Sequence, residues 1–223
     1  MTSRSVIITA GGIGKRMSSD IPKQFLLLGS KPILMHTIEL FYRFDENIEI
    51  LLALPADWRG YWETLVEKHY FRIPHLVISG GEERFYSIKN ALKRVTGEFV
   101  AVHDGVRPLT SPEVIRTCFE SLEKFKAVIP VIPIKESIRQ FTHEKNHAVK
   151  REEYKLVQTP QCFHTFVLKK LYEQTYDASF TDDASLAERL EIPIHLIEGN
   201  EENIKITTRL DLLLAETIFA KNK

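Results

Sequence analysis

A glycine-rich segment near the N-terminus has the residue types needed to bind a phosphate group. It consists of Ala10, Gly11, Gly12, Ile13 and Gly14. Lys15 and Arg16 follow directly, and Lys23 comes after a proline. Glycine has no Cβ, so backbone N–H groups can approach an anion closely, and lysine or arginine supplies the countercharge. An ordinary tight turn is the alternative for this segment alone, but the basic residues at both ends favour a phosphate site.

Two common phosphate-binding motifs do not fit this segment. Residues 12–14 supply the G-x-G of a dinucleotide-binding fingerprint, but its third glycine is missing. The second expected strand ends in Leu-Pro-Ala at 54–56, where an acidic residue would be needed for a ribose. The chain also lacks the G-x-x-x-x-G-K-[ST] pattern of a P-loop. The phosphate site therefore belongs to neither class.

A second polar cluster contains Asp104, which follows His103 and precedes Arg107. An aspartate at the end of a buried strand can hold a hydrated divalent cation or a substrate hydroxyl. Together with Gly105 it can also form a simple turn. One carboxylate and one histidine are too few for a dedicated zinc site.

Other candidate residues are isolated in the sequence. Arg151 and Lys205 lie on polar segments, so their spacing alone predicts solvated surface. Ser137, Thr159 and Thr181 are ordinary hydroxyl residues, and Thr181 is well placed to cap a helix. The sequence contains no arguable Ser-His-Asp or Cys-His arrangement. Basic residues outnumber candidate bases, which suits phosphoryl or nucleotidyl transfer, where catalysis is mostly positioning and charge neutralisation.

The elements that position these residues alternate along the first part of the chain. Apolar runs predict strands at 6–10, 48–54, 75–79, 99–103 and 127–132, and the runs at 6–10, 48–54 and 99–103 predict buried strands. Helical spacing predicts helices from 32 to beyond 41, at 58–69, after 84, and from the Ser-Pro pair at 111–112 to about 125. This order predicts a Rossmann-like α/β fold, with a mostly parallel sheet flanked by helices. Ligands of such sheets bind at the carboxyl ends of the strands, where the polar clusters lie.

The pattern changes after the fifth predicted strand. Residues about 136–157 predict a protruding β-hairpin arm. Helices are then predicted at 165–175 and, capped by Thr181, at 182–190, with a closing helix at 210–219. Short strands are predicted at 194–198 and 203–207. No linker is recognisable, so we expect a single domain over residues 1–223, with the arm inserted.

Composition excludes several kinds of partner. The chain has 223 residues, with 30 basic and 30 acidic side chains, so its net charge does not attract nucleic acid or an anionic membrane. No segment is long and apolar enough to span a membrane. Cys118 and Cys162 lie outside any CxxC pattern, and the helical spacing around Cys118 predicts a core position. We expect a cytoplasmic protein.

The ordered set of motifs resembles a known family. Residues 10–17 with Pro-Lys-Gln-Phe at 22–25 look like the signature of the sugar-phosphate nucleotidyltransferases. Further matches are Gly-Gly-Glu-Glu-Arg at 80–84 with Ser87, His-Asp-Gly-Val-Arg-Pro at 103–108, Gln-Thr-Pro-Gln at 158–161, Thr-Asp-Asp-Ala-Ser at 181–185, Glu-Gly at 198–199 and Asn-Ile-Lys-Ile-Thr at 203–207. Together they resemble the 2-C-methyl-D-erythritol 4-phosphate cytidylyltransferases over nearly the whole chain.

This resemblance implies a reaction and a role for each candidate. CTP and 2-C-methyl-D-erythritol 4-phosphate would give 4-diphosphocytidyl-2-C-methyl-D-erythritol and pyrophosphate, in non-mevalonate isoprenoid synthesis. Arg16 and Lys23 would contact the CTP phosphates, and the backbone of 10–14 with Lys15 would surround the nucleotide. Cytidine contacts would come from Gly81, Glu82 and Ser87. The polyol pocket would contain Asp104, Arg107, Ser137, Thr159 and Thr181, with Asp104 near a bound Mg²⁺. Arg151 and Lys205 would hold the attacking phosphate.

The resemblance also implies a homodimer in which Arg151 reaches the partner's site. Four positions depart from the family pattern: many members have two alanines at 105–106, and Arg and Thr are frequent at the positions of Lys15 and Ser137. Two alternatives remain. Ribitol-5-phosphate cytidylyltransferases share the fold and the N-terminal motifs, and a non-catalytic nucleotide-binding protein could use the same fold.

Overall fold

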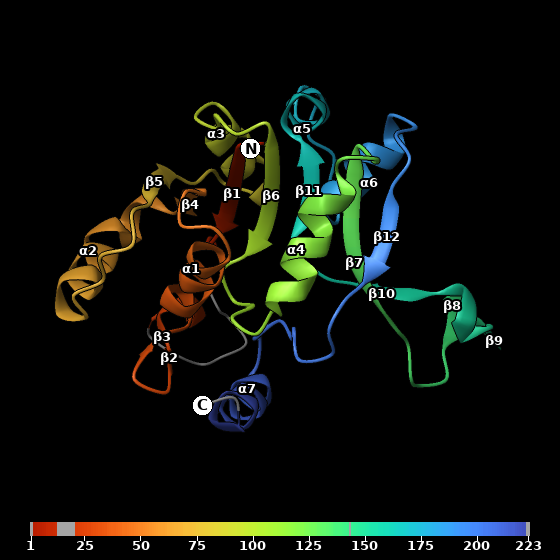
Figure 1. Ribbon diagram of the computed structural model, residues 1–223. Helices are drawn as coiled ribbons and strands as arrows, with labels where there is room; N and C mark the ends of the chain where they lie inside the picture. The colour runs from red at the N-terminus through yellow and green to blue at the C-terminus, as the bar shows by residue number, and fades with distance from the viewer. Residues whose placement is uncertain (1, 13–20, 143, 222–223) are drawn as a thin grey trace.

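The computed structural model describes residues 2–12, 21–142 and 144–221 (Figure 1). Its centre is an eight-stranded sheet with the order β10-β7-β11-β6-β1-β4-β5, in which β12 also pairs with β7. The strands are β1 (Arg4–Thr9), β4 (Glu49–Leu54), β5 (Leu76–Ser79), β6 (Phe99–Asp104), β7 (Ala127–Pro133), β10 (Lys155–Val157), β11 (Gln161–His164) and β12 (His195–Glu198). The mostly parallel α/β architecture predicted from the sequence is confirmed.

The strands predicted as buried form the middle of the sheet. Ile7 of β1 lies opposite Leu51 of β4 and Val102 of β6, and all three side chains are fully buried. Both faces of these parallel strands are covered, which is why their sequences are continuously apolar. The register also places the end of β1 beside the end of β6, since Thr9 pairs with Asp104.

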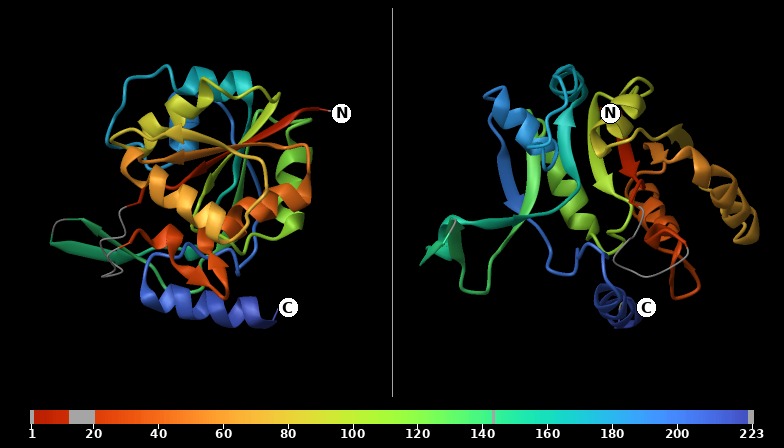
Figure 2. Two further views of the ribbon diagram at one scale, coloured as in Figure 1. Left: turned by 90° about the vertical axis from the view of Figure 1, so that its left-hand side faces the viewer. Right: turned by 180° about the vertical axis from the view of Figure 1, so that it is seen from behind.

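Helices cover both faces of the sheet (Figure 2). They are α1 (Ile33–Phe44), α2 (Arg59–Lys68), α3 (Arg84–Leu92), α4 (Pro112–Ser121), α5 (Thr165–Leu171), α6 (Asp183–Arg189) and α7 (Arg209–Lys221). One core joins the sheet to α1, α2 and α4, and it contains Cys118 as predicted. A second core joins the other face to α3, α5 and α6. The C-terminal α7 packs on a smaller apolar cluster around Leu28 and Ile206.

Short elements complete the fold. The described residues include the 3-10 helices η1 (Lys23–Phe25), η2 (Ala56–Trp58) and η3 (Arg151–Glu153), and β2 (Leu27–Leu28) pairs with β3 (Lys31–Pro32). Ser111 caps α4 by accepting a hydrogen bond from the Val114 N–H at 3.2 Å, as expected. Across the described ranges, none of the helices combines the length and apolarity needed to cross a bilayer.

The structure corrects three sequence predictions. The cap of α6 is Asp182 and not Thr181, because the Asp182 carboxylate accepts the Ser185 N–H at 2.9 Å while Thr181 precedes the helix. Residues 203–207 form no strand, since their polar groups bond to neighbouring loops. The helix predicted at 165–175 ends at Leu171.

An antiparallel strand was also missing from the prediction. β11 lies between β6 and β7 and runs antiparallel to both. β10 runs antiparallel to β7 as well, and residues 158–160 separate β10 from β11. This break carries Gln158 and Thr159 to the carboxyl edge of the sheet.

The predicted hairpin arm is present, with its strands at β8 (Arg139–Thr142) and β9 (Lys145–Ala148). These two strands pair with each other, and their residues are exposed. Figure 1 shows the hairpin projecting beyond β10, away from the helix-covered sheet. The chain leaves the sheet after Pro133 and returns at Lys155, and these two residues are paired neighbours.

Candidate active site

A cavity of about 300 Å³ opens at the carboxyl edge of the parallel strands. Its wall combines the segments that follow β1, β5 and β6 with η1 and one residue of the 203–207 loop. The predicted site residues that line it are Ala10, Gly11, Gly12, Lys23, Gly81, Glu82, Ser87, Asp104 and Lys205. Residues widely separated in the sequence are therefore brought together as the motifs implied. Ile13, Gly14, Lys15 and Arg16 lie outside the described residues.

The wall formed by residues 81–87 is held tightly. The Ser87 hydroxyl accepts the Gly81 N–H at 3.0 Å and donates to the Glu83 carbonyl at 3.2 Å. A Cβ built on Gly81 would lie 2.4 Å from the Cβ of Tyr86, closer than two carbons can approach. Glycine at this position therefore lets the loop fold against the start of α3.

Gln24 is a site residue that sequence reasoning did not single out. Its side-chain amide donates to the Ala10 carbonyl at 2.6 Å, and the residue is 1% exposed. This bond ties η1, which carries Lys23, to the start of the glycine segment. Beside it, the ring of Phe25 contacts Trp58 and other aromatic residues, with centroids 5.8 Å apart for that pair. Packing and hydrogen bonding thus fix Lys23 at the cavity wall.

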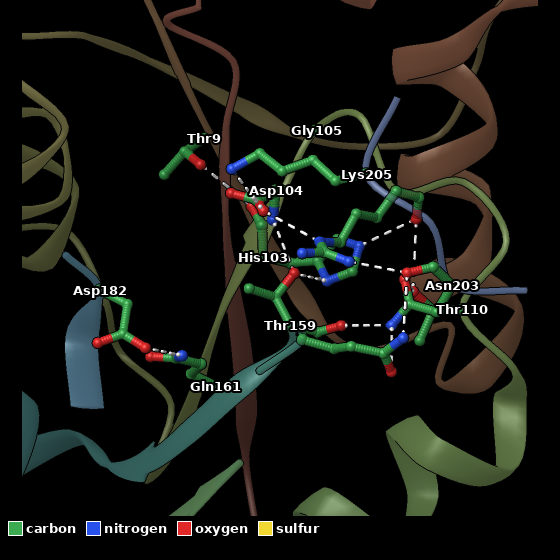
Figure 3. A network of polar contacts seen from close by, with 12 residues as sticks. Thr9, His103, Asp104, Gly105, Thr110, Thr159, Gln161, Asp182, Asn203 and Lys205 are labelled. Carbon is green, nitrogen blue, oxygen red and sulfur yellow. Dashed lines mark hydrogen bonds and ion pairs between the residues drawn. The ribbon is translucent and has the colours of Figure 1, made fainter. Parts of the chain in front are cut away.

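Asp104 is buried and paired with two cations (Figure 3). Its Oδ2 accepts from the Arg107 Nε and lies 3.1 Å from the Lys205 Nζ. Burial alone would raise the pKa of Asp104, but Lys205, Arg84 and Arg107 together lower it well below its usual range. Asp104 is therefore a carboxylate at neutral pH.

A hydrogen-bond chain behind Asp104 fixes the adjacent residues (Figure 3). The Thr159 hydroxyl accepts the Asp104 N–H at 3.2 Å and lies 3.0 Å from the His103 Nδ1. The Nε2 of His103 lies 3.1 Å from the Arg107 carbonyl, which can only accept, so Nε2 carries the proton and Nδ1 accepts from Thr159. Burial lowers the pKa of His103 to about 4. This histidine is neutral and structural.

Asn203 is a second residue to which the sequence analysis gave no role, although it begins the motif at 203–207. It is fully buried, and its carbonyl accepts from the Arg107 guanidinium at 2.7 Å. Its side-chain amide donates to the Thr159 carbonyl at 2.8 Å and accepts from the Thr110 hydroxyl at the same distance. These bonds position Arg107 and place Lys205 beside Asp104. A single asparagine in a polar loop has no spacing that would reveal this.

A second cavity, of about 310 Å³, adjoins the first. Among the predicted site residues it is lined by Asp104, Arg107, Thr159, Thr181 and Lys205. Asp104, Lys205 and Arg84 line both cavities, so they form the junction between them. Thr181 is therefore a pocket residue although it is not the cap of α6.

Two of the predicted site residues lie outside the two adjoining cavities of their own chain. Ser137 is exposed on the segment that leads into the arm. Arg151 lies in η3 and lines a separate hollow at the base of the arm. Its guanidinium donates to the Lys135 carbonyl and to the Glu152 carboxylate. Neither residue lines the two adjoining cavities of its own chain.

The donor set at the junction fits Mg²⁺ bound together with phosphates. Within the described ranges, no group of three or more His, Cys, Asp and Glu residues is placed to hold a metal alone. Mg²⁺ in nucleotide sites is commonly held by one or two carboxylates with substrate phosphates and water. Asp104 offers such a carboxylate, and its two ion pairs within the described ranges both use Oδ2.

The first cavity contains glycines and Lys23 at the carboxyl edge of a mostly parallel sheet, and a second polar pocket adjoins it. This is the arrangement expected of an α/β nucleotidyltransferase. The family model described as 2-C-methyl-D-erythritol 4-phosphate cytidylyltransferase matches residues 5–221. The chain belongs to this family and is a nucleotidyltransferase.

Individual relatives match this chain over nearly the whole length of both proteins. A 2-C-methyl-D-erythritol 4-phosphate cytidylyltransferase of Bacteroides thetaiotaomicron is 51% identical over 217 residues, covering 97% of this chain and 99% of the relative. One from Bacillus thuringiensis is 37% identical, covering 98% and 99%. The crystal structure of a 4-diphosphocytidyl-2C-methyl-D-erythritol synthase from Anaerococcus prevotii has a TM-score of 0.84 at 28% identity, covering 98% and 99%. The Thermus thermophilus cytidylyltransferase has a TM-score of 0.80 at 30% identity, covering 98% of each chain.

Proposed function

We propose that this enzyme transfers the cytidylyl group of CTP to 2-C-methyl-D-erythritol 4-phosphate, a step of isoprenoid precursor synthesis. The observation that carries the proposal is the junction of two cavities at Asp104 and Lys205. One cavity has the glycine segment and Lys23 of a nucleotide site, and the other has the hydroxyl and cationic groups of a polyol phosphate site.

In the reaction, a phosphate oxygen of the polyol phosphate forms a bond to the α-phosphorus of CTP. The bond between that phosphorus and the oxygen leading to the β-phosphate breaks, and pyrophosphate leaves with the bonding electrons. The attacking phosphate is already an anion, so no general base is required. The task of the protein is to align the two phosphates and to stabilise the charge that develops between them.

Lys23 and Arg16 are proposed to stabilise that charge. The backbone of the glycine segment would surround the triphosphate, since its N–H groups can approach an anion without a side chain in the way. Gly81, Glu82 and Ser87 would contact cytidine at the wall formed by residues 81–87. Glu82 also lines the cavity, which supports this assignment.

On the acceptor side, Lys205 and Arg107 would bind the attacking phosphate, and Asp104 would orient the polyol hydroxyls. Thr159 and Thr181 line the same cavity. The Thr159 hydroxyl bonds to His103 and Asp104, so its contribution is to hold these residues in place. Asp104 would also hold Mg²⁺ with the CTP phosphates, and the ion would neutralise part of their charge.

Arg151 and Ser137 are proposed to act in the site of a partner subunit. Both lie on the segment between β7 and β10, outside the cavities of their own chain. An exposed hairpin that carries Phe141 with 72% of its surface accessible suits contact with a second copy. A cytoplasmic location is part of the proposal, and it is supported by Cys118 and Cys162, which are buried and form no disulfide.

The test is pyrophosphate release by purified protein with CTP and Mg²⁺. Release with 2-C-methyl-D-erythritol 4-phosphate, and much less with ribitol 5-phosphate, is the expected result. The reverse preference would make the enzyme a ribitol-5-phosphate cytidylyltransferase. Binding of CTP with no turnover of either polyol phosphate would indicate a non-catalytic nucleotide-binding protein.

A further inference from the structure

Arg84 lies at the junction of the two cavities but has no place in the scheme above. It is the first residue of α3, it lines both cavities, and its side chain is 33% exposed. Its charge acts on Asp104, where it is second to Lys205 among the cations that lower the pKa of that carboxyl. The guanidinium is therefore close to the place where the two substrates would meet.

Arg84 is held from behind by a fully buried carboxylate. Its two terminal nitrogens donate to the two oxygens of Asp183, at 3.1 and 2.6 Å. The Tyr172 hydroxyl donates to Asp183 Oδ1 at 2.5 Å. Burial and the Asp183 charge raise the pKa of Tyr172, so the hydroxyl remains a donor. The guanidinium is thus fixed in a defined orientation by residues of α5, α6 and the turn between them.

Stability alone is a poor explanation for this arrangement. A buried ion pair contributes little net stability, because the desolvation of the two charges offsets their attraction. Asp183 and Tyr172 are nevertheless both buried where they bond in series to Arg84, and Phe85 stacks on Tyr172 with ring centroids 4.8 Å apart. Such packing fixes the direction of one side chain at the wall that both cavities share.

The remaining donors of Arg84 are suited to phosphate. A guanidinium has five N–H groups, and the pair with Asp183 uses two of them. The planar fork binds phosphate oxygens with defined geometry, and a fixed fork loses less entropy on binding than a mobile one. CTP and the polyol phosphate each bring a phosphate group to the junction.

We propose that Arg84 contacts the phosphate groups of both substrates at the junction of the two cavities, and that Asp183 and Tyr172 are positioning residues that orient it. This inference rests on the proposed function, since it takes the two cavities as the sites of CTP and of the polyol phosphate. It predicts that a change of Arg84 raises the KM of both substrates, whereas a change of a residue that lines only one cavity affects one substrate.

The test compares five variants with the wild type, and one of them, Ser87→Ala, changes a residue that lines only the first cavity. Arg84→Lys keeps the charge but loses the fork, Asp183→Asn removes the buried charge, and Tyr172→Phe removes one hydroxyl. Arg189→Lys is the matched control, because Arg189 lies on α6 in an exposed pair with Asp177. The measurements are the KM of each substrate, kcat, the CTP dissociation constant by calorimetry, and the melting temperature.

Arg84→Lys is expected to raise the KM of both substrates by at least about tenfold, the scale of one charge-assisted hydrogen bond. Asp183→Asn should act in the same direction, and Tyr172→Phe less strongly, while Arg189→Lys should resemble the wild type. Tyr172→Phe removes a single hydroxyl, so it keeps the test valid if Asp183→Asn does not fold. In contrast, Ser87→Ala should raise only the KM of CTP.

Unchanged constants in folded Arg84→Lys protein would overturn the inference, and so would a change for one substrate alone. The CTP dissociation constant separates this failure from failure of the proposed function. It requires no polyol phosphate, so an unchanged CTP affinity in Arg84→Lys overturns the role of Arg84 whichever acceptor the enzyme uses. A wild type that binds CTP but releases no pyrophosphate would instead contradict the proposed function.

Discussion

Asp104 remains charged although it is buried, because it lies among positive charges. Lys205 and Arg107 contact it directly, and the charge of Arg84 also acts on it. This balance lets one carboxylate stay ionised in a site whose ligands are polyanions. At the scale of single residues, the site is therefore mainly cationic, and charge neutralisation is the contribution expected from its lysines and arginines.

Lys23→Ala should lower kcat by roughly 10²–10³, the effect of removing one donor from a developing negative charge. The measurement is steady-state pyrophosphate release at saturating CTP. Lys93→Ala is a suitable control, because Lys93 is an exposed lysine that bonds to Asn90 outside the two cavities. Equal turnover in the Lys23 variant and the control would remove Lys23 from the mechanism.

At the scale of elements, rigid loops at strand ends position the site. The segment after β5 folds back on α3 through Gly81 and Ser87, and η1 is held by Gln24 and by aromatic packing. Each loop thereby depends on contacts outside the cavity. Changes in such contacts are expected to affect substrate affinity without touching a substrate-binding group.

Gly81→Ala tests the wall formed by residues 81–87. The added Cβ would lie 2.4 Å from the Tyr86 Cβ, so the loop must shift away from α3. We expect kcat/KM for CTP to fall by up to about 10²-fold, the effect of a displacement near 1 Å, with a smaller effect on the KM of the polyol phosphate. Gly60→Ala is the control, since a Cβ there meets nothing within 4 Å. Activity equal to that control would show that the loop adapts.

Lowering the pH should weaken the aromatic packing that supports η1. The Nε2 of His75 accepts from the Trp62 indole at 3.0 Å, and burial lowers the pKa of His75 despite its bond to the Ile73 carbonyl. The unfolded chain therefore takes up this proton at a higher pH than the folded protein. The contribution of His75 to the free energy of unfolding is therefore fully present above its unfolded pKa of about 6.5, and it is lost as the pH falls below that value.

The measurement is the urea midpoint at about pH 7 and about pH 5. His75→Gln keeps an acceptor for Trp62 but does not titrate, so its midpoint should fall less than that of the wild type. His36 and His103, whose pKa values are also lowered by burial, are present in both proteins and cancel in the comparison. An equal fall of the urea midpoint in the wild type and in His75→Gln would contradict the prediction.

The first part of the fold could be predicted from the sequence because each buried parallel strand is a continuous apolar run. β11 could not, because it is short and has Gln161 and His164 at its ends, so its place between β6 and β7 depends on tertiary packing. The glycine segment and Asp104 were recognisable by their residue types. Gln24 and Asn203 lie within motifs of the resemblance, but their roles could not be predicted, because these roles are hydrogen bonds to distant backbone groups.

At the scale of the whole molecule, one chain holds two cavities but keeps Arg151 outside them. If two subunits share their sites, Arg151→Ala and Lys23→Ala subunits should complement each other. A mixed dimer would contain one site with both changes and one with neither, so it should recover about half of the wild-type activity by independent-site additivity. Co-expression with two affinity tags gives the mixed dimer.

The matched control is a mixture of Lys23→Ala and Lys205→Ala subunits. Lys23 and Lys205 line the same cavity of one chain, so these variants should not complement each other. Mixed dimers of Arg151→Ala and Lys23→Ala that stay inactive would show that Arg151 serves its own subunit or none. Size-exclusion chromatography with light scattering gives the oligomeric state in the same preparation.

The pairing of Pro133 with Lys155 separates the arm from the folding of the sheet. Because the excursion starts and finishes at neighbouring residues, its length can change without altering the register of any strand in the central sheet. A short turn could therefore replace the segment between these two residues. Evolution could likewise lengthen or shorten the arm while the nucleotide site stays intact.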